Sequence, residues 1–179
     1  MRSLVLLLAA LLAPLASAQA QGDAQFAQAL EIYNRARAGQ SSQVERAIAA
    51  FDALSRSDPS QPLYRAYLGS AMVLRGRDAW MPWNKMRYTD EGLDRIDQAL
   101  AALRPEHDRQ LLRGVPVGLE TRLVAGMTFI KVPDAVFHRR SAGVKLLGNL
   151  LHHPALAAAP AGFRAAVIKA SESVTETSR

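Results

Sequence analysis

The sequence predicts an all-α protein built from antiparallel helix pairs. Three observations lead to this fold class. Alanine (32) and leucine (24) dominate the 179 residues, whereas aromatic residues make up only 6%, a composition that favours helices over β-sandwiches and barrels. Apolar residues recur at spacings of three and four, as on one face of a helix. Glycine and proline punctuate these apolar patterns at intervals typical of short helices.

The first eighteen residues are typical of a secretory signal peptide. Arg2 precedes an apolar run from Leu4 to Leu15, and small residues at Ala16, Ala18 and Ala20 provide cleavage sites after residue 18 or residue 20. The run is shorter than the roughly 20 residues of a membrane-spanning helix, and no later segment approaches that length. We therefore expect an exported mature chain with no transmembrane segment.

Export and composition together suggest a compartment. The 22 basic residues, mostly arginine, and the many alanines are typical of a GC-rich bacterial genome, so the expected location is the periplasm. The chain has no cysteine, which excludes disulfides, thiolate metal sites and a cysteine nucleophile. The net charge of +6 is spread along the chain; in an exported protein it points to acidic partners or lipid headgroups, and we expect no nucleic-acid binding.

Three helices are predicted in the first half of the mature chain. The first spans 24–38 and ends at Gly39, the second ends before Pro59, and the third begins at Pro62 and ends at Gly76. Segment 77–91 then interrupts the pattern with both tryptophans of the chain and is predicted to be a long connection. Thr89 is expected to cap a fourth helix that runs to about Leu103.

The second half of the chain is predicted to form a further helical stack over 106–173. Its expected elements are a short helix over 106–114, a helix from Pro116 to Ile130, one from Asp134 to Leu151, and one from Pro160 to Ser173. The last six residues, 174–179, are expected to form a disordered tail, because serine, threonine and glutamate replace the apolar pattern there.

A repeat pattern organises residues 24–105. Ala47, Phe51, Leu54 and Pro59 have the spacing that the second helix of a tetratricopeptide repeat shows, and Leu68-Gly69 then falls on the Leu-Gly pair of the next repeat without any change of register. The chain therefore resembles a tetratricopeptide-like (TPR-like) helical repeat protein. The resemblance implies a TPR-like solenoid of two degenerate repeats over 24–105, followed by the divergent stack.

The sequence also departs from the repeat pattern. A few extra residues lie near Gln40–Gln43, and about eleven lie between Gly76 and Gly92, where the repeat normally has alanine. Beyond residue 105 the signature is not evident. An unrelated helical bundle with similar spacing is the alternative interpretation.

The candidate binding residues come from the second repeat and from segment 77–91. The resemblance implies a binding surface lined by the first helix of each repeat, on which Tyr67 and Ser70 would lie. Segment 77–91 adds residue types that are enriched at interface hot spots. The candidate partner-binding residues are Tyr67, Ser70, Trp80, Trp83, Arg87 and Tyr88. In the alternative interpretation, the two tryptophans are buried and fill the interface between repeats.

The sequence carries no motif for catalysis or for a cofactor. It lacks the nucleophile elbow, the phosphate-binding loop, the dinucleotide fingerprint and the paired-histidine zinc motif. The adjacent histidines His152 and His153 would point about 100° apart on a helix, which is unsuitable for a shared metal. We therefore expect no catalytic residues, no metal and no cofactor; an enzyme would need a deep pocket with convergent Glu, His or Arg side chains.

The sequence thus predicts an exported, non-enzymatic protein that binds a protein or peptide partner, as an adaptor in a bacterial envelope assembly. A purely structural or chaperone-like subunit, whose partner covers the Trp-rich segment, is the alternative. Exposure of Trp80 and Trp83 distinguishes the two: exposed rings favour reversible recognition, whereas two buried rings favour a structural role.

Overall fold

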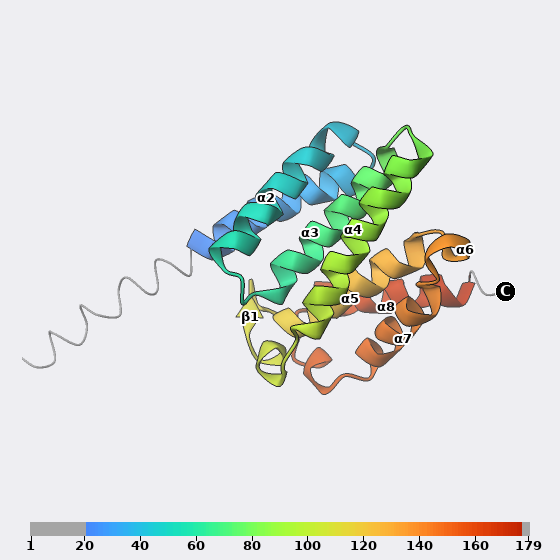
Figure 1. The fold of residues 1–179 in the computed structure, drawn as a ribbon. Coiled ribbons are helices and arrows are strands. Elements are labelled where there is room, and N and C mark those ends of the chain that lie inside the picture. The colour runs from blue at the N-terminus through green and yellow to red at the C-terminus, as the bar shows by residue number, and fades with distance from the viewer. Residues whose placement is uncertain (1–20, 177–179) are drawn as a thin grey trace, which may run out of the picture.

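The computed structural model describes residues 21–176 and confirms the all-α class (Figure 1). Residues 21–37 are helical, and the signal peptide predicted over 1–18 lies outside the described residues. The α-helices that follow are α2 (Val44–Ser57), α3 (Pro62–Asp78), α4 (Pro82–Ala101), α5 (Val117–Lys131), α6 (Asp134–Phe137), α7 (Arg140–Leu151) and α8 (Ala161–Glu176). The shorter elements are η1 (Ser41–Gln43), η2 (Pro105–Asp108), η3 (Pro154–Leu156) and a hairpin of β1 (Leu111–Leu112) and β2 (Val115–Pro116).

Helix α3 is the centre of the fold. It packs against α2, α4 and α5, while α7 and α8 lie beyond α5 (Figure 1). Helix 21–37 runs parallel to α3, because Phe26 contacts Tyr64 and Tyr67, and further along Tyr33 bonds to Ser70. Helix α5 runs in the same direction, and its contacts with Tyr67 and Ser70 also occur in chain order. Helix 21–37, α3 and α5 are therefore parallel, and they follow one another in space in the same order as in the chain.

The core has three clusters: one rich in aromatic rings, an aliphatic one, and a smaller one between α4 and α5 around Ile96 and Phe129. Phe51 of α2 is fully buried and stacks on Tyr67, with the ring centroids 4.9 Å apart. Phe26 and Tyr33 of the first helix pack edge-on against the same ring of Phe51. On the other side of α5, aliphatic side chains of α5, α7 and α8 form the second cluster. Of the residues that match the repeat pattern, Ala47, Phe51 and Leu54 are buried, whereas Pro59 is exposed.

Segment 77–91 is not the long connection that the sequence predicts. Helix α3 continues through Asp78 and α4 begins at Pro82, so only residues 79–81 connect them. Gly76 does not end α3, because it packs against the buried Thr89 of α4, whose hydroxyl occupies the space that a Cβ on Gly76 would need. Thr89 is correspondingly not a helix cap. The extra residues lengthen two packed helices, and Pro82 occupies the first turn of α4, where its missing N–H costs no hydrogen bond.

Three further elements of the second half differ from the prediction. Residues 111–116 form a hairpin in place of a short helix, because Arg113 and Gly114 adopt the positive φ values (51° and 77°) of a two-residue turn. The helix predicted over 134–151 is broken at His138, which is left-handed with φ 52°. Helix α8 reaches Glu176, beyond the predicted start of the tail, because Val174 is buried against the aliphatic cluster; the rest of that tail, 177–179, lies outside the described residues.

Candidate ligand-binding pocket

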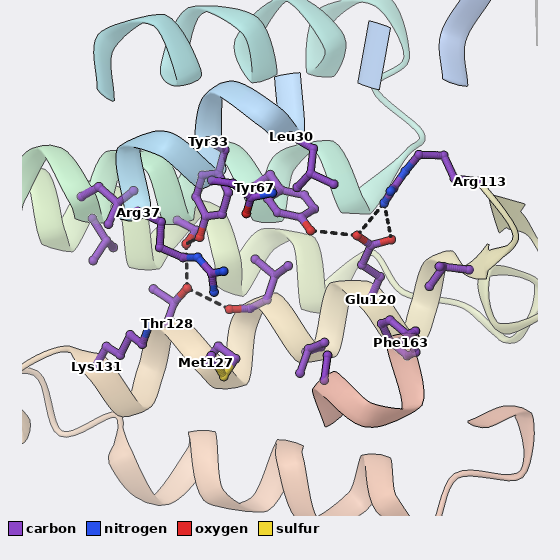
Figure 2. A pocket seen from close by; sticks show the side chains of 18 of the residues that line it. Leu30, Tyr33, Arg37, Tyr67, Arg113, Glu120, Met127, Thr128, Lys131 and Phe163 are labelled. Atoms are coloured by element: carbon purple, nitrogen blue, oxygen red, sulfur yellow. Dashed lines mark hydrogen bonds and ion pairs between the residues drawn. The ribbon is translucent and has the colours of Figure 1, made fainter. Parts of the chain in front are cut away.

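A pocket of about 470 Å³ opens along the three parallel helices. Its walls come from helix 21–37, α3 and α5, and α8 contributes Phe163 and Ala166 (Figure 2). This volume falls within the range of about 300–1,000 Å³ that is usual for ligand sites in proteins. We refer to it as the interhelical pocket. Leu30, Val73 and Met127 form part of its apolar lining, and polar groups lie between them.

A chain of hydroxyl groups joins the three helices across the pocket. The hydroxyl of Ser70 on α3 lies 2.8 Å from that of Tyr33 on the first helix and 2.8 Å from that of Thr128 on α5 (Figure 2). The Thr128 hydroxyl donates to the carbonyl of Val124, so its own lone pairs remain for Ser70. All three residues are buried. The chain therefore fixes the spacing of the helices that line the pocket.

Glu120 lies at one end of the pocket and is buried. Its Oε1 atom accepts hydrogen bonds from the Tyr67 hydroxyl at 2.8 Å and from the Arg113 guanidinium at 3.0 Å (Figure 2). Arg113 comes from the hairpin turn and also lies over the ring of Phe26, 4.7 Å from its centroid. Burial raises the pKa of Glu120 above its ordinary value of 4.5, although Arg113 and the Tyr67 hydrogen bond act in the opposite direction. The carboxylate is thus engaged by protein groups.

The raised pKa of Glu120 gives a pH-dependent stability. The folded chain holds the Glu120 proton more tightly than the unfolded chain, so this group stabilises the fold below pH 4.5 and loses that contribution as the pH rises through the raised pKa. We expect the unfolding free energy of wild type, relative to Glu120→Gln, to decrease from pH 4.5 towards neutrality. Denaturant titrations of both proteins at a series of pH values test this. A wild type that gains stability over the variant as the pH rises contradicts it, and the exposed Glu106→Gln is the matched control.

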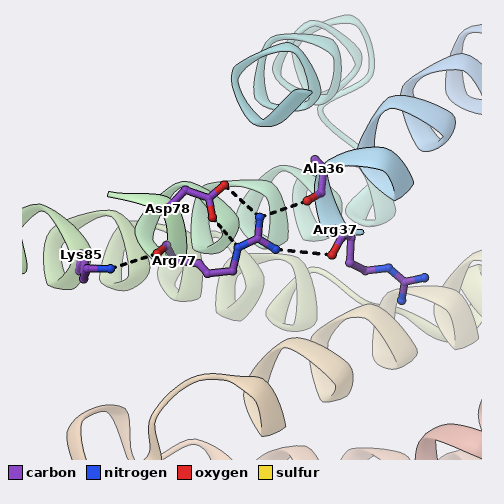
Figure 3. Close-up of polar contacts among 5 residues, drawn as sticks. All are labelled: Ala36, Arg37, Arg77, Asp78 and Lys85. Carbon is purple, nitrogen blue, oxygen red and sulfur yellow. Dashed lines mark hydrogen bonds and ion pairs between the residues drawn. The ribbon is translucent and has the colours of Figure 1, made fainter. Parts of the chain in front are cut away.

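The opposite end of the pocket is positively charged. Arg37, Arg77 and Lys131 belong to helix 21–37, α3 and α5, and all three line the pocket. Desolvation lowers the pKa of Lys131, and the charges of Arg37 and Arg77 lower it further. Arg77 is engaged by Asp78 and by the carbonyl of Ala36, 3.1 Å away (Figure 3). Within residues 21–176, no ion pair forms with the side chain of Arg37 or Lys131.

The structure divides the predicted binding residues between two surfaces. Tyr67 and Ser70 line the interhelical pocket, although both are buried there and bonded to protein groups. Trp80 and Trp83 lie at the turn between α3 and α4, with 88% and 64% of their surface exposed. They therefore do not fill the interface between repeats. The centroid of the Tyr88 ring on α4 lies 4.3 Å from the guanidinium of Arg75 and 4.8 Å from that of Arg87.

Several pocket residues have no signal in the sequence. Glu120 lies in the first turn of α5, where a carboxylate normally complements the helix dipole, and Arg37 and Lys131 resemble solvated charges at helix ends. They come together only because helix 21–37, α3 and α5 are parallel. Helical register places Tyr33 and Thr128 on the buried faces of their helices, but it does not show that both meet Ser70.

His107 and His153 make contacts that hold local structure. Nδ1 of the buried His107 accepts the backbone N–H of Arg104 and so holds the start of η2. His153 lies 3.4 Å from a carboxylate oxygen of Asp108, which also binds Arg122. Across the described part of the chain, no three His, Asp or Glu side chains are grouped as metal ligands would be.

None of the helices within residues 21–176 has the length and apolar composition needed to cross a bilayer. No protein-family model matches the chain, and no curated protein or solved structure shows significant similarity to it.

Proposed function

We propose that this chain is an exported TPR-like repeat protein that binds an acidic peptide segment of a partner protein in the interhelical pocket. The expected location is the periplasm, where such a protein would serve as an adaptor in an envelope assembly. The observation that carries the proposal is the pair of cations, Arg37 and Lys131, that have no ion-pair partner in the described chain and lie at the end of an apolar pocket.

The arrangement of the helices supports a repeat origin for the pocket. Helices α2, α4 and α7 each come after one of the three parallel helices in the chain. Each of them carries a small residue, a large apolar residue four positions later, and another apolar residue three positions after that. The three sets are Ala47, Phe51 and Leu54; Gly92, Ile96 and Ala99; and Gly143, Leu147 and Leu150. All nine residues are buried. This shared pattern favours a third helix pair, α5 with α7, beyond the two repeats that the sequence predicts.

The chemistry of the pocket favours a peptide with acidic side chains. Its apolar walls would cover aliphatic side chains of an extended segment. A carboxylate between Arg37 and Lys131 would restore the pKa of Lys131, because an opposite charge favours the protonated amine. A hydrogen bond between this carboxylate and Arg37 or Lys131 would be stronger than a hydrogen bond between neutral groups. The chain of hydroxyl groups already fixes the spacing of the pocket walls, so peptide binding needs little reorganisation of the protein.

Charge reversal tests the proposal. We expect a fluorescent hexapeptide of alternating leucine and glutamate to bind, and its leucine–lysine counterpart not to bind, in anisotropy titrations of the chain from Gln21. Arg37→Glu with Lys131→Glu is expected to weaken acidic-peptide binding at least tenfold, because two attractions become repulsions. Arg56→Glu with Lys145→Glu, on exposed faces of α2 and α7, makes the same charge change and is the matched control.

The outcomes also separate this proposal from the alternatives. Equal binding of both peptides, or unchanged binding after the Arg37 and Lys131 reversal, would contradict a cationic peptide site. A structural or chaperone-like subunit, covered by its partner at the exposed tryptophans, would bind neither peptide in the pocket. Because Tyr67 and Arg113 already engage the carboxylate of Glu120, we expect Glu120→Gln to retain peptide binding.

A further inference from the structure

The turn between α3 and α4 lies at one end of the molecule (Figure 1). Four large apolar side chains lie there: Trp80, Met81, Trp83 and Met86. All four side chains are exposed to solvent. Trp80 and Met81 belong to the three-residue turn itself. We refer to these four residues as the Trp–Met tip. Exposed apolar clusters of this kind are uncommon on soluble proteins and mark binding surfaces.

The segment that carries the Trp–Met tip is rich in basic residues. Residues 75–87 contain four basic side chains, those of Arg75, Arg77, Lys85 and Arg87, and one acidic side chain, that of Asp78. Arg75 pairs with Glu45 and Arg77 pairs with Asp78, so both carry a nearby countercharge. Lys85 and Arg87 make no ion pair within the described residues; Lys85 donates to the carbonyl of Arg77 (Figure 3), and Arg87 donates to the amide oxygen of Asn84.

The tip is held rigidly. Gly76 of α3 packs against Thr89 and the Lys85 carbonyl of α4, which brings the two helices into close contact just behind the turn. Arg77 then joins the end of α3 to the end of helix 21–37 through the carbonyl of Ala36 (Figure 3). The tryptophans therefore project from a well-packed scaffold and not from a loosely held loop. Their exposed rings contribute little to the packing of that scaffold.

We propose that the Trp–Met tip docks on the surface of an anionic lipid bilayer. Tryptophan has an amphipathic ring that favours the membrane–water interface, and lysine and arginine beside it favour anionic headgroups. Lys85 and Arg87, which make no ion pair within the described residues, lie within four residues of Trp83, so positive charge lies close to the ring in the chain. A protein partner would need about 800 Å² on each side, whereas two tryptophans offer at most about 500 Å² on a turn only three residues long. This inference is independent of the interhelical pocket.

The chain offers a direct readout, because Trp80 and Trp83 are its only tryptophans. The protein used begins at Gln21, since all the contacts described above lie within residues 21–176 and an apolar leader would itself bind lipid. We expect vesicles containing phosphatidylglycerol to shift the tryptophan emission to the blue, and brominated lipids to quench it. Pure phosphatidylcholine vesicles are expected to bind more weakly, and salt is expected to weaken binding to the anionic vesicles.

Variants assign the effect to the tip. Trp80→Ala with Trp83→Ala is expected to reduce vesicle co-sedimentation at least tenfold, because each ring contributes a large apolar surface, and Lys85→Gln with Arg87→Gln is expected to reduce binding to anionic vesicles only. Val136→Ala with Ile168→Ala removes exposed apolar side chains elsewhere and is the matched control; circular dichroism checks that all variants fold. Unshifted emission with both kinds of vesicle, or co-sedimentation unaffected by loss of both tryptophans, overturns the proposal. Emission that shifts with a protein partner but not with vesicles would instead identify a protein-binding tip.

Discussion

Replacing Phe51 by alanine is expected to destabilise the protein by about 3–5 kcal/mol, the usual cost of truncating a buried phenylalanine. Phe51 is fully buried, stacks on Tyr67 and receives the edges of Phe26 and Tyr33. Its removal leaves a cavity bounded by the rings of Phe26, Tyr33 and Tyr67, and these rings on helix 21–37 and α3 cannot fill the space without moving the two helices. Denaturant unfolding followed by circular dichroism measures the change.

The matched control for Phe51→Ala is Trp80→Ala. The tryptophan is the larger side chain, but 88% of it is exposed, so the unfolding free energy is expected to change by no more than about 0.5 kcal/mol. Phe51→Leu should lie between the two because it fills much of the cavity. A Trp80→Ala protein as destabilised as Phe51→Ala would show that the tip is part of the core, contrary to the structure.

Alanine at Gly69 or Gly92 is expected to destabilise the protein by about 3 kcal/mol, at the upper end of the range for overpacked sites. A Cβ on Gly92 would lie 2.6 Å from the backbone oxygen of Gly69, and a Cβ on Gly69 would meet the backbone oxygen of Gly92. A backbone oxygen inside a helix cannot rotate away, so α3 and α4 would have to separate. Because α3 also lines the interhelical pocket, peptide binding should weaken together with stability.

Gly148 provides a control of opposite sign. It lies within α7, and no atom lies within 4 Å of the position that a Cβ would occupy. Gly148→Ala is therefore expected to stabilise the protein by up to about 1 kcal/mol, since alanine favours a helix and lowers the entropy of the unfolded chain. If Gly69→Ala and Gly148→Ala shift the unfolding midpoint in the same direction, the close approach of α3 and α4 is wrong.

The two surfaces are compatible in one protein. The Trp–Met tip lies at the turn between α3 and α4, while the interhelical pocket runs along helix 21–37, α3, α5 and α8. Arg77 is close to both, because it lines the pocket and holds the base of the tip. Because Arg37 and Trp80 themselves belong to different surfaces, we expect variants at Arg37 to change mainly peptide binding and variants at Trp80 to change mainly lipid binding.

Gly69 and Gly76 show how much of the helix packing can be predicted from the sequence. Gly69 matches the Leu-Gly pair of the repeat pattern, and in the structure it allows the close approach of α3 and α4 at Gly92. Gly76 matches the same repeat pattern at a position where a helix normally ends, yet α3 continues through it. A glycine is compatible both with a helix end and with a close contact between helices. The neighbour across the interface, Thr89, decides between them and lies thirteen residues away.

The sequence alone determined the helical class and most helix positions, because periodicity and helix propensity are local properties of the chain. Only the tertiary structure decided that Glu120 meets Tyr67 and Arg113, that Arg37 and Lys131 share one end of a pocket, and that Trp80 and Trp83 are exposed. These features depend on the direction in which separate helices cross and on which side chains they bring together. That geometry arises from packing between distant segments, and no local spacing in the sequence records it.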